Sequence, residues 1–291
     1  MQRERLLKQV KKIVERSDYL QVFIENVRSA VDLIAERKGR KIVAKIVKNI
    51  DSVSEEAATE LSSFANFIGA KPVIIGEFSS NGKLKDDFVY SRFSIDCVSI
   101  EGFEDMISEL PQPKAAKSVG AKIKINGSKL RAIRSINNMS AKELAKKIGV
   151  SSNSIYRYEE KSPYASLEVV KKINNLFKER IELNAYEDTS QKVEVTTFTN
   201  IKLSAIITSS MPFDLVAKGN VNYYEVCTEN DMRTLIKRAK VMKEIKETFE
   251  NNYPFFVIES KREEIIGLPV ISKKVLNEIN SENKLLELIM G

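Results

Sequence analysis

The chain has 291 residues, of which 43% are hydrophobic and 30% are charged, and its formal net charge is +7. This length accommodates two or three domains, and the composition is that of a soluble globular protein. Histidine is absent from the sequence, which excludes Ser-His and Cys-His catalytic arrangements, histidine general bases and HExxH metal sites. The sequence contains neither a GxxxxGK[ST] nor a GxGxxG loop, so we expect no nucleotide cofactor.

Location and redox state follow from the same composition. No apolar run approaches the roughly 20 residues that cross a membrane. The first residues, MQRERLLKQVKK, are too charged for a secretion signal, so the sequence predicts a cytoplasmic protein with no membrane partner. The two cysteines, Cys97 and Cys227, make neither a disulfide framework nor a zinc site. Both lie in apolar, strand-like contexts, and we expect buried thiols.

The first segment, residues 1–112, reads as one α/β domain. An amphipathic charged helix at 2–16 is followed by strand-like runs, and a helix at 54–68 begins at a Ser cap and ends before Gly69. Further strands are expected at 72–77, 89–90 and 97–100, with a last helix at 102–110. Strands arranged around a helix in this way predict a mixed α/β layer structure. Residues 113–125 read as a linker containing Pro and Lys, followed by a short strand.

The next segment, residues 126–187, carries local signals of three short helices. Leu130, Ile133 and Ile136 give the first helix an apolar face. Ser140 and Glu143 have the spacing of a capping box that opens a second helix. That helix is expected to end at Gly149, because glycine readily takes the left-handed conformation at a helix end.

A third helix is expected over residues 152–159, after a cap at Ser151. Ile155 and Tyr158 face inward, so the remaining positions form a polar outer face. A short helix with such a face, placed after a tight turn, is typical of the recognition helix of a helix-turn-helix. The outward residues are Ser152, Asn153, Ser154, Tyr156 and Arg157.

The run LAKKIGVSSNSIYRYE resembles the Cro/cI-type (lambda-repressor-like) helix-turn-helix family. That family adds a helix after the recognition helix, and residues 165–177 supply one with apolar residues in register. Charge agrees with this interpretation, because residues 126–180 hold 12 Lys and Arg against 5 Asp and Glu. The resulting +7 equals the net charge of the whole chain, so the excess lies where DNA phosphates would need neutralising.

The last segment, residues 188–291, looks like a second copy of the first. Residues 31–35 (VDLIA) match 213–217 (FDLVA), and residues 72–75 (PVII) match 254–257 (PFFV), both at an offset of 182. Later matches have an offset of 172, as if ten loop residues were missing. We favour a duplicated α/β domain over chance similarity between two amphipathic stretches. The predicted architecture is therefore α/β plus all-α, with the helix-turn-helix domain between two similar α/β domains.

Both α/β segments resemble PD-(D/E)xK nucleases, in a degenerate form. That chemistry needs an Asp and a second acid to hold a divalent cation, with a Lys two residues after the acid. The first copy has Asp32 and Lys45 but Val43 in place of the acid, and the second has Asp214 and Glu225 but Cys227 in place of Lys. We therefore expect no catalytic residue and no metal site in either copy, and we expect both Asp side chains to be solvated at strand ends. A site pooled from both copies would require a domain arrangement that the sequence does not show.

Nearly the whole chain is similar to an archaeal family of Cro/cI-type transcriptional regulators, on the runs AKIVKNID, GAKPVIIGE and PFDLVAKG. The resemblance implies a regulator that binds double-stranded DNA sequence-specifically through its recognition helix. A homodimer on a palindromic site is expected, with the flanking domains used for dimerisation or for a partner in the transcription machinery. Arg131 and Arg134 are expected to contact phosphates or to be solvated. The expected DNA-binding residues are Ser140, Lys142, Ser151, Ser152, Asn153, Ser154, Tyr156 and Arg157.

Two other functions are compatible with the sequence. A metal-dependent nuclease targeted by the helix-turn-helix would require divalent cations and would lose activity on substitution of Asp32 or Glu225. A protein-interaction scaffold would keep all its partners when Asn153 and Arg157 are replaced.

Overall fold

The computed structural model describes residues 2–80, 82–86, 89–108, 122–161, 164–179, 181, 196–198, 201, 203–227, 231–259 and 262–291. The chain forms two compact units. The first comprises Met1–Gln9, Val47–Ser52 and Val73–Thr189, and the second comprises Val10–Ile46, Val53–Pro72 and Ser190–Gly291. The predicted domain boundaries at residues 112 and 187 lie outside the described residues, as does most of the expected linker, so that division stays a prediction.

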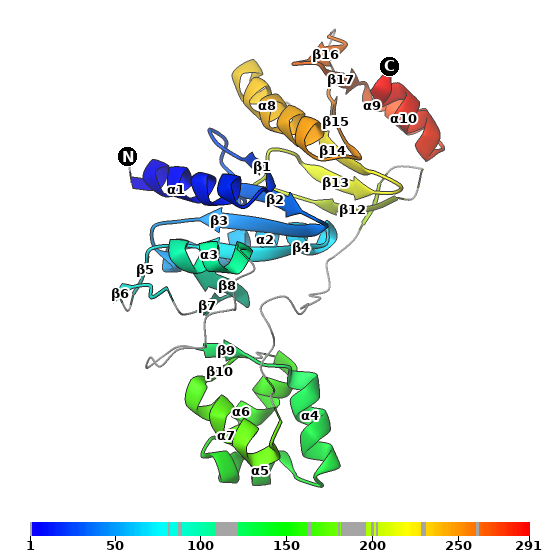
Figure 1. Ribbon diagram of the computed structural model, residues 1–291. Coiled ribbons are helices and arrows are strands. Elements are labelled where there is room, and N and C mark those ends of the chain that lie inside the picture. The colour runs from blue at the N-terminus through cyan, green and yellow to red at the C-terminus, as the bar shows by residue number, and fades with distance from the viewer. Residues whose placement is uncertain are drawn as a thin grey trace. The chain divides into compact units, whose positions relative to one another are not determined.

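The first sheet has the strand order β1-β2-β3-β4-β8-β7 (Figure 1). Strands β1, β2 and β3 form an antiparallel meander, β4 runs parallel to β8, and β7 is antiparallel to β8. Ser54 caps α2 by accepting a hydrogen bond from the Ala57 amide, as its sequence context predicts. The elements are α1 (Gln2–Arg16), β1 (Leu20–Phe23), β2 (Leu33–Arg37), β3 (Arg40–Ile46), a 3-10 turn (Ile50–Ser52), α2 (Glu55–Phe67), β4 (Ala70–Ile75), β7 (Tyr90–Arg92), β8 (Ile95–Val98) and α3 (Ile100–Ile107), with β5 (Phe78–Ser79) and β6 (Gly82–Lys83) forming a separate hairpin.

The second sheet has the order β11-β12-β13-β14-β15-β17-β16, which repeats the first sheet with one strand added at the edge. The strand directions repeat in the antiparallel β12-β13-β14 meander, in the parallel β15-β17 pair and in antiparallel β16. In the second sheet β14 also runs parallel to β15. The shared topology supports the predicted duplication. The elements are β11 (Thr196–Phe198), β12 (Leu203–Ile207), β13 (Leu215–Lys218), β14 (Asn222–Val226), α8 (Met232–Thr248), β15 (Asn252–Val257), β16 (Glu264–Ile265), β17 (Leu268–Ile271), α9 (Lys273–Glu278) and α10 (Glu282–Met290).

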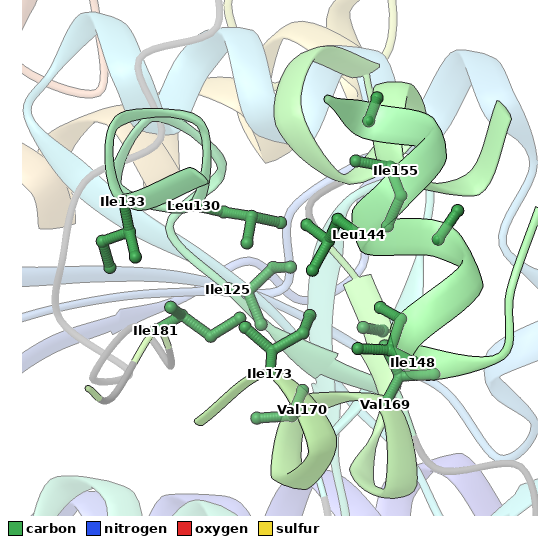
Figure 2. Close-up of a cluster of buried hydrophobic side chains, with 13 residues drawn as sticks. Ile125, Leu130, Ile133, Leu144, Ile148, Ile155, Val169, Val170, Ile173 and Ile181 are labelled. Atoms are coloured by element: carbon green, nitrogen blue, oxygen red, sulfur yellow. The ribbon is translucent and has the colours of Figure 1, made fainter. Parts of the chain in front are cut away.

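The helical segment lies in the first unit and has its own apolar core, shown in Figure 2. Leu130, Leu144, Ile155 and Ile173 are all fully buried there, so each helix contributes to one cluster. The elements are β9 (Lys122–Lys124), α4 (Gly127–Ile136), α5 (Ala141–Ile148), α6 (Ser152–Tyr156), a π-helical turn (Arg157–Lys161), β10 (Tyr164–Ser166) and α7 (Leu167–Phe177). Strands β9 and β10 pair antiparallel.

One residue of the expected apolar face of α4 is placed differently. Ile136 is 79% exposed, so the prediction that it packs inward is wrong. Residues spaced by three advance 300° around a helix of 3.6 residues per turn, and each step therefore drifts about 60° off the face. Leu130 and Ile133 stay within the core, but the next step places Ile136 in solvent.

None of the described helices combines the length and the apolar character needed to cross a bilayer.

Candidate nucleic-acid interface

Both ends of α5, including the turn that leads to α6, are fixed by local backbone geometry. The Ser140 side chain accepts a hydrogen bond from the Glu143 amide, and the Glu143 carboxylate accepts one from the Ser140 amide at 2.7 Å, which completes a capping box. At the other end, Gly149 adopts the left-handed conformation with φ 76°. The Val150 amide donates back to the Ala145 carbonyl, so the chain reverses within a few residues.

Helix α6 presents a polar outer face above a single buried anchor. Ile155 is fully buried in the core, whereas Asn153, Tyr156 and Arg157 are exposed. Ser151 caps the helix by accepting a hydrogen bond from the Ser154 amide at 3.1 Å. The hydroxyls of these two serines also lie 2.9 Å apart, so both are already engaged in the cap before any ligand arrives. The free polar groups of this face are therefore concentrated in the longer side chains.

The expected continuous helix over residues 152–159 is divided into two parts. The α-helical part ends at Tyr156, and residues Arg157–Lys161 follow as a π-helical turn. The Arg157 amide donates to the carbonyls of both Asn153 and Ser154, so the backbone remains helical across the junction. The face predicted from the sequence is thus retained, although its pitch changes at Arg157.

An ion pair joins α4 to the end of this face. Arg134 donates from Nε to Glu159 Oε1 at 2.6 Å and from Nη2 to Glu159 Oε2 at 2.9 Å, and a third bond reaches the Met139 carbonyl. The Arg134 side chain is 14% exposed and that of Glu159 is 2% exposed, and the hydrogen bond to Glu159 raises the pKa of Arg134. The expectation that Arg134 would be solvated is wrong, because this side chain is held between α4 and the π-helical turn, while its contact with phosphate stays a prediction.

The start of α4 also packs closely against the backbone of the π-helical turn. A Cβ on Gly127 would lie 2.5 Å from the Tyr158 carbonyl oxygen and 2.8 Å from that of Glu159. Only glycine fits at the start of α4 without moving the end of the recognition segment. The sequence gives no local signal for this requirement, because the contact joins residues more than 30 positions apart.

Charge on the described helical segment is partly paired. Arg131 lies 3.3 Å from Glu160 and Lys129 lies 3.6 Å from Glu179, both in exposed pairs of little energetic weight. Lys142 is exposed in the first turn of α5, where the helix dipole disfavours a cation. A cation kept at such a position is suited to an anionic partner such as a DNA phosphate.

We expected the strand-end carboxylate of the first sheet to be solvated, and this expectation is wrong. Asp32 is 1% exposed, its Oδ2 accepts a hydrogen bond from the Ile46 amide at 2.7 Å, and its Oδ1 lies 3.2 Å from the Lys45 ammonium. Lys45 also donates to the Ser29 carbonyl. Asp32 is therefore a buried residue of the fold, held by a cation from the neighbouring strand.

The equivalent carboxylate of the second sheet is paired with a different cation. Arg238 of α8 donates from Nη2 to Asp214 Oδ1 and from Nε to the Pro212 carbonyl, and its side chain is 7% exposed. Glu225 lies beside this pair, where burial and then the Asp214 charge raise its pKa to about 7. Cys227 is exposed, contrary to expectation, and its amide donates to Asp214 Oδ2, whereas Cys97 is buried as predicted.

Comparisons with known proteins give a match for the helix-turn-helix segment and another for the N-terminal α/β segment. The helix-turn-helix family matches residues 130–183, and the PD-(D/E)XK superfamily domain matches residues 3–113. Relatives from Thermococcus kodakarensis and Pyrococcus horikoshii are each 30% identical over 99% of this chain and over 96% and 98% of their own lengths. A relative from Methanothermobacter thermautotrophicus is 30% identical over 99% of this chain and 96% of its own. All three carry the name "Putative HTH-type transcriptional regulatory protein".

The chain belongs to this family of HTH-type transcriptional regulatory proteins. The resemblance predicted from the sequence is confirmed for the helix-turn-helix and for the nuclease-like N-terminal segment. No solved structure matches the chain.

The divalent cation of PD-(D/E)xK chemistry does not fit the residues of this regulator. In the first sheet both Asp32 oxygens are engaged and Val43 occupies the position of the second acid. In the second sheet Arg238 already places its positive charge against Asp214. Among the residues that the structure describes, none form a group of three or more metal-ligating side chains. A metal ion would have to displace a buried internal cation, which costs several kcal/mol.

Proposed function

We propose that this protein is a sequence-specific regulator that binds double-stranded DNA, with the segment 152–159 lying in the major groove. The observation that carries the proposal is the exposed polar face of α6 on a rigid support. Ile155 anchors that face from below, and the Arg134–Glu159 ion pair anchors its far end. A recognition helix held in this way can present side chains to base edges without first becoming ordered.

Base readout would rest on the two longest exposed polar side chains. Asn153 matches the N6 and N7 groups of adenine, and Arg157 matches O6 and N7 of guanine or a phosphate. Tyr156 is 53% exposed between them and adds a contact to the groove wall or the sugar-phosphate backbone. Ser152, which is half-buried, would contribute a shorter hydrogen bond, and the Ser154 hydroxyl, which is also engaged in the α6 cap, would contribute one through its remaining hydrogen-bonding capacity.

Phosphate contacts would come from the turns that flank the groove. Ser140 and Ser151 begin α5 and α6, and Lys142 carries an exposed cation in the first turn of α5. Contacts of this kind fix the register of a protein on DNA and make its affinity salt-dependent. One recognition helix covers few base pairs, so we propose a homodimer on a near-palindromic site with half-sites about 34 Å apart. The flanking domains would bind a partner or support dimerisation.

We also propose that this regulator does not cleave nucleic acid. Each α/β sheet lacks one of the three groups that the nuclease reaction needs, and each remaining Asp is neutralised by the chain itself. A nuclease would need two acids free to share a divalent cation. The Asp32–Lys45 and Asp214–Arg238 pairs therefore stabilise the fold.

The test is a selection from random double-stranded DNA at 100 mM salt, with three proteins run side by side. The proteins are the parent chain, the Asn153→Ala/Arg157→Ala variant and a matched control, Lys171→Ala/Asn175→Ala. The control replaces one Asn and one cation on the exposed surface of α7. We expect the parent and the control to enrich the same motif and the Asn153→Ala/Arg157→Ala variant to enrich none.

Equal enrichment by all three proteins would exclude α6 as the reader. Each lost base contact should cost about 1 to 3 kcal/mol, which exceeds the resolution of such a selection. Titrating the selected DNA with the Lys142→Ala variant separates phosphate contacts from base contacts. That variant should lower affinity for all sequences alike and reduce the slope of log K against log salt by about one.

A further inference from the structure

The second unit contains a contact between two residues at equivalent positions of the two sheets. Ser29 Oγ lies 3.6 Å from Met211 Sδ, and the two residues are 182 positions apart. The same offset aligns β4 (Ala70–Ile75) with β15 (Asn252–Val257) residue for residue. When two like domains are related by a two-fold axis, a residue on the axis touches its own equivalent. The Ser29–Met211 contact therefore marks an internal pseudo-two-fold axis.

The backbone beside this contact follows the same symmetry in position but only partly in its hydrogen bonds. The Ala30 amide donates to the Ser210 carbonyl at 2.6 Å. The symmetry-related bond would run from the amide of residue 212 to the carbonyl of Arg28. Residue 212 is Pro and has no N–H to donate, so one half of the pair is chemically impossible. The arrangement is symmetric in position although not in every hydrogen bond.

The helices and edge strands exchange contacts reciprocally across the axis. Helix α2 packs on β12, and α8 packs on β1. Helix α8 occupies the place of α2 in the repeated topology, and β12 occupies that of β1. Reciprocal contact of this kind defines an isologous interface, the arrangement by which two copies of one domain form a closed pair.

Two surface grooves repeat the symmetry. One lies between α2 and the end of β12, with Glu55, Thr59, Ile207 and Thr208 among its lining residues. The other lies beside α8 and the end of β1. Four of its lining residues are the equivalents, 182 positions away, of the four residues just named. Those four are Lys237, Val241, Glu25 and Asn26, respectively.

The interface itself is packed like a protein interior. Phe64 of α2 and Phe213 are both fully buried, with ring centroids 5.3 Å apart, and Tyr224 packs edge-on against Phe213 at 5.0 Å. Beside these rings, the Glu60 carboxylate accepts hydrogen bonds from the amides of Ser209 and Ser210, each at 2.7 Å. An apolar centre with satisfied polar groups at its rim is typical of a permanent interface.

We infer that the two α/β copies are each other's partner, paired inside one chain about the axis at Ser29 and Met211. The face that a single α/β domain would use to dimerise is therefore filled within each chain. Any association of two chains on a palindromic site has to use another surface. This inference does not depend on DNA binding by the helix-turn-helix.

A pair of engineered cysteines tests the inference. In a Cys227→Ser background, which removes the exposed native thiol, Ser29→Cys and Met211→Cys are combined and the folded protein is oxidised at low micromolar concentration. We expect loss of both new thiols and one covalently closed chain that migrates faster than the reduced chain on a denaturing gel. The yield should not depend on protein concentration. The single variants Ser29→Cys and Met211→Cys serve as controls, because the remaining Cys97 is buried and the new thiol can therefore link only between chains.

Two results would overturn the inference. Covalent dimers in place of closed monomers would show that the copies pair between chains, and retention of both thiols in this variant and also in a folded Ala30→Cys/Ser210→Cys variant would show that they do not pair. If circular dichroism shows that this variant fails to fold, Ala30→Cys with Ser210→Cys probes the same contact.

A measurement on the native side chains provides a second, independent test. Hydrogen exchange at the amides of Ser209 and Ser210 should be slow in the parent, because the Glu60 carboxylate accepts both hydrogen bonds. Glu60→Ala should accelerate that exchange at least tenfold, whereas Glu56→Ala on the same helix should not. Fast exchange in the parent would contradict the pairing even if neither cysteine variant folds.

Discussion

The two sheets share one topology but neutralise the same strand-end carboxylate in different ways. Asp32 is paired with Lys45 from the adjacent strand, whereas Asp214 is paired with Arg238 from the helix that follows. At the offset of 182, the counterpart of Lys45 is Cys227 and that of Arg238 is Glu56. The strand-end Asp is thus paired with a cation in both copies, but the cation comes from a different element in each. Charge balance has been kept in both copies, while the set of groups needed for catalysis is complete in neither.

The largest effect is expected for Arg238→Met. This change leaves Asp214 and Glu225 side by side without a cation, and breaking a buried pair from one side costs about 3 to 5 kcal/mol. Urea unfolding at pH 7.5 measures the loss. Lys237→Met, on the exposed face of the same helix, should change the unfolding free energy by less than about 0.5 kcal/mol. A loss below 1 kcal/mol for Arg238→Met would contradict the role assigned to it.

A smaller effect is expected for the counterpart change in the first sheet. Lys45→Met removes the cation from Asp32 alone, since position 43 is Val, and Asp32 keeps its hydrogen bond from the Ile46 amide. A buried carboxyl can also take up a proton, so we expect a loss of about 2 to 3 kcal/mol. Lys41→Met in the same strand is the control. If Lys45→Met lowers the unfolding free energy as much as Arg238→Met does, the two sheets do not differ in their dependence on the cation.

The pH dependence of stability should distinguish the second sheet. Glu225 has a pKa of about 7 in the folded protein, above its ordinary value of 4.5. The folded chain therefore keeps a proton that the unfolded chain releases, and stability falls as pH rises through this window. Glu225→Gln should be more stable than the parent at pH 8 by about 2 kcal/mol and no more stable at pH 4. Parallel stability curves for the two proteins would refute the assignment.

The smallest effect is expected at the polar rim of the interface. Glu60→Gln keeps one oxygen to accept from the amides of Ser209 and Ser210 but loses the charge that strengthens both bonds. We expect a loss of about 1 kcal/mol in thermal or urea unfolding. Glu56→Gln should leave stability within about 0.5 kcal/mol of the parent. If Glu60→Gln and Glu56→Gln have the same unfolding free energy, the hydrogen bonds from Ser209 and Ser210 to the Glu60 carboxylate contribute no measurable stability.

The helix-turn-helix could be predicted because its signals are local. The capping box at Ser140, the left-handed Gly149 and the inward Ile155 lie within 16 residues, and each acts through neighbouring backbone. The ion pair between Arg134 and Glu159 cannot be predicted from local sequence, because its partners are 25 residues apart and meet only in the folded chain. Ile136 was misplaced because a three-residue spacing drifts around a helix.

The α/β segments were predictable as a repeat but not in their buried charges. The constant offset of 182 between matching runs predicts two similar sheets. A lone Asp at the start of a strand has the pattern of a surface residue, and Asp32 is buried because a partner 13 positions along the chain neutralises it. Arg238 gave no signal at all, because it stands among other cations on a highly charged helix.

The pairing of unlike copies also produces two grooves with different charges. In a dimer of identical chains, both grooves beside the axis must carry the same residues and bind two equal ligands. Here the equivalent positions hold Glu55 in one groove and Lys237 in the other, so the two grooves differ in the sign of their charge at this point. An ion favoured in one groove at this point would be disfavoured in the other, a difference that two identical chains could not provide.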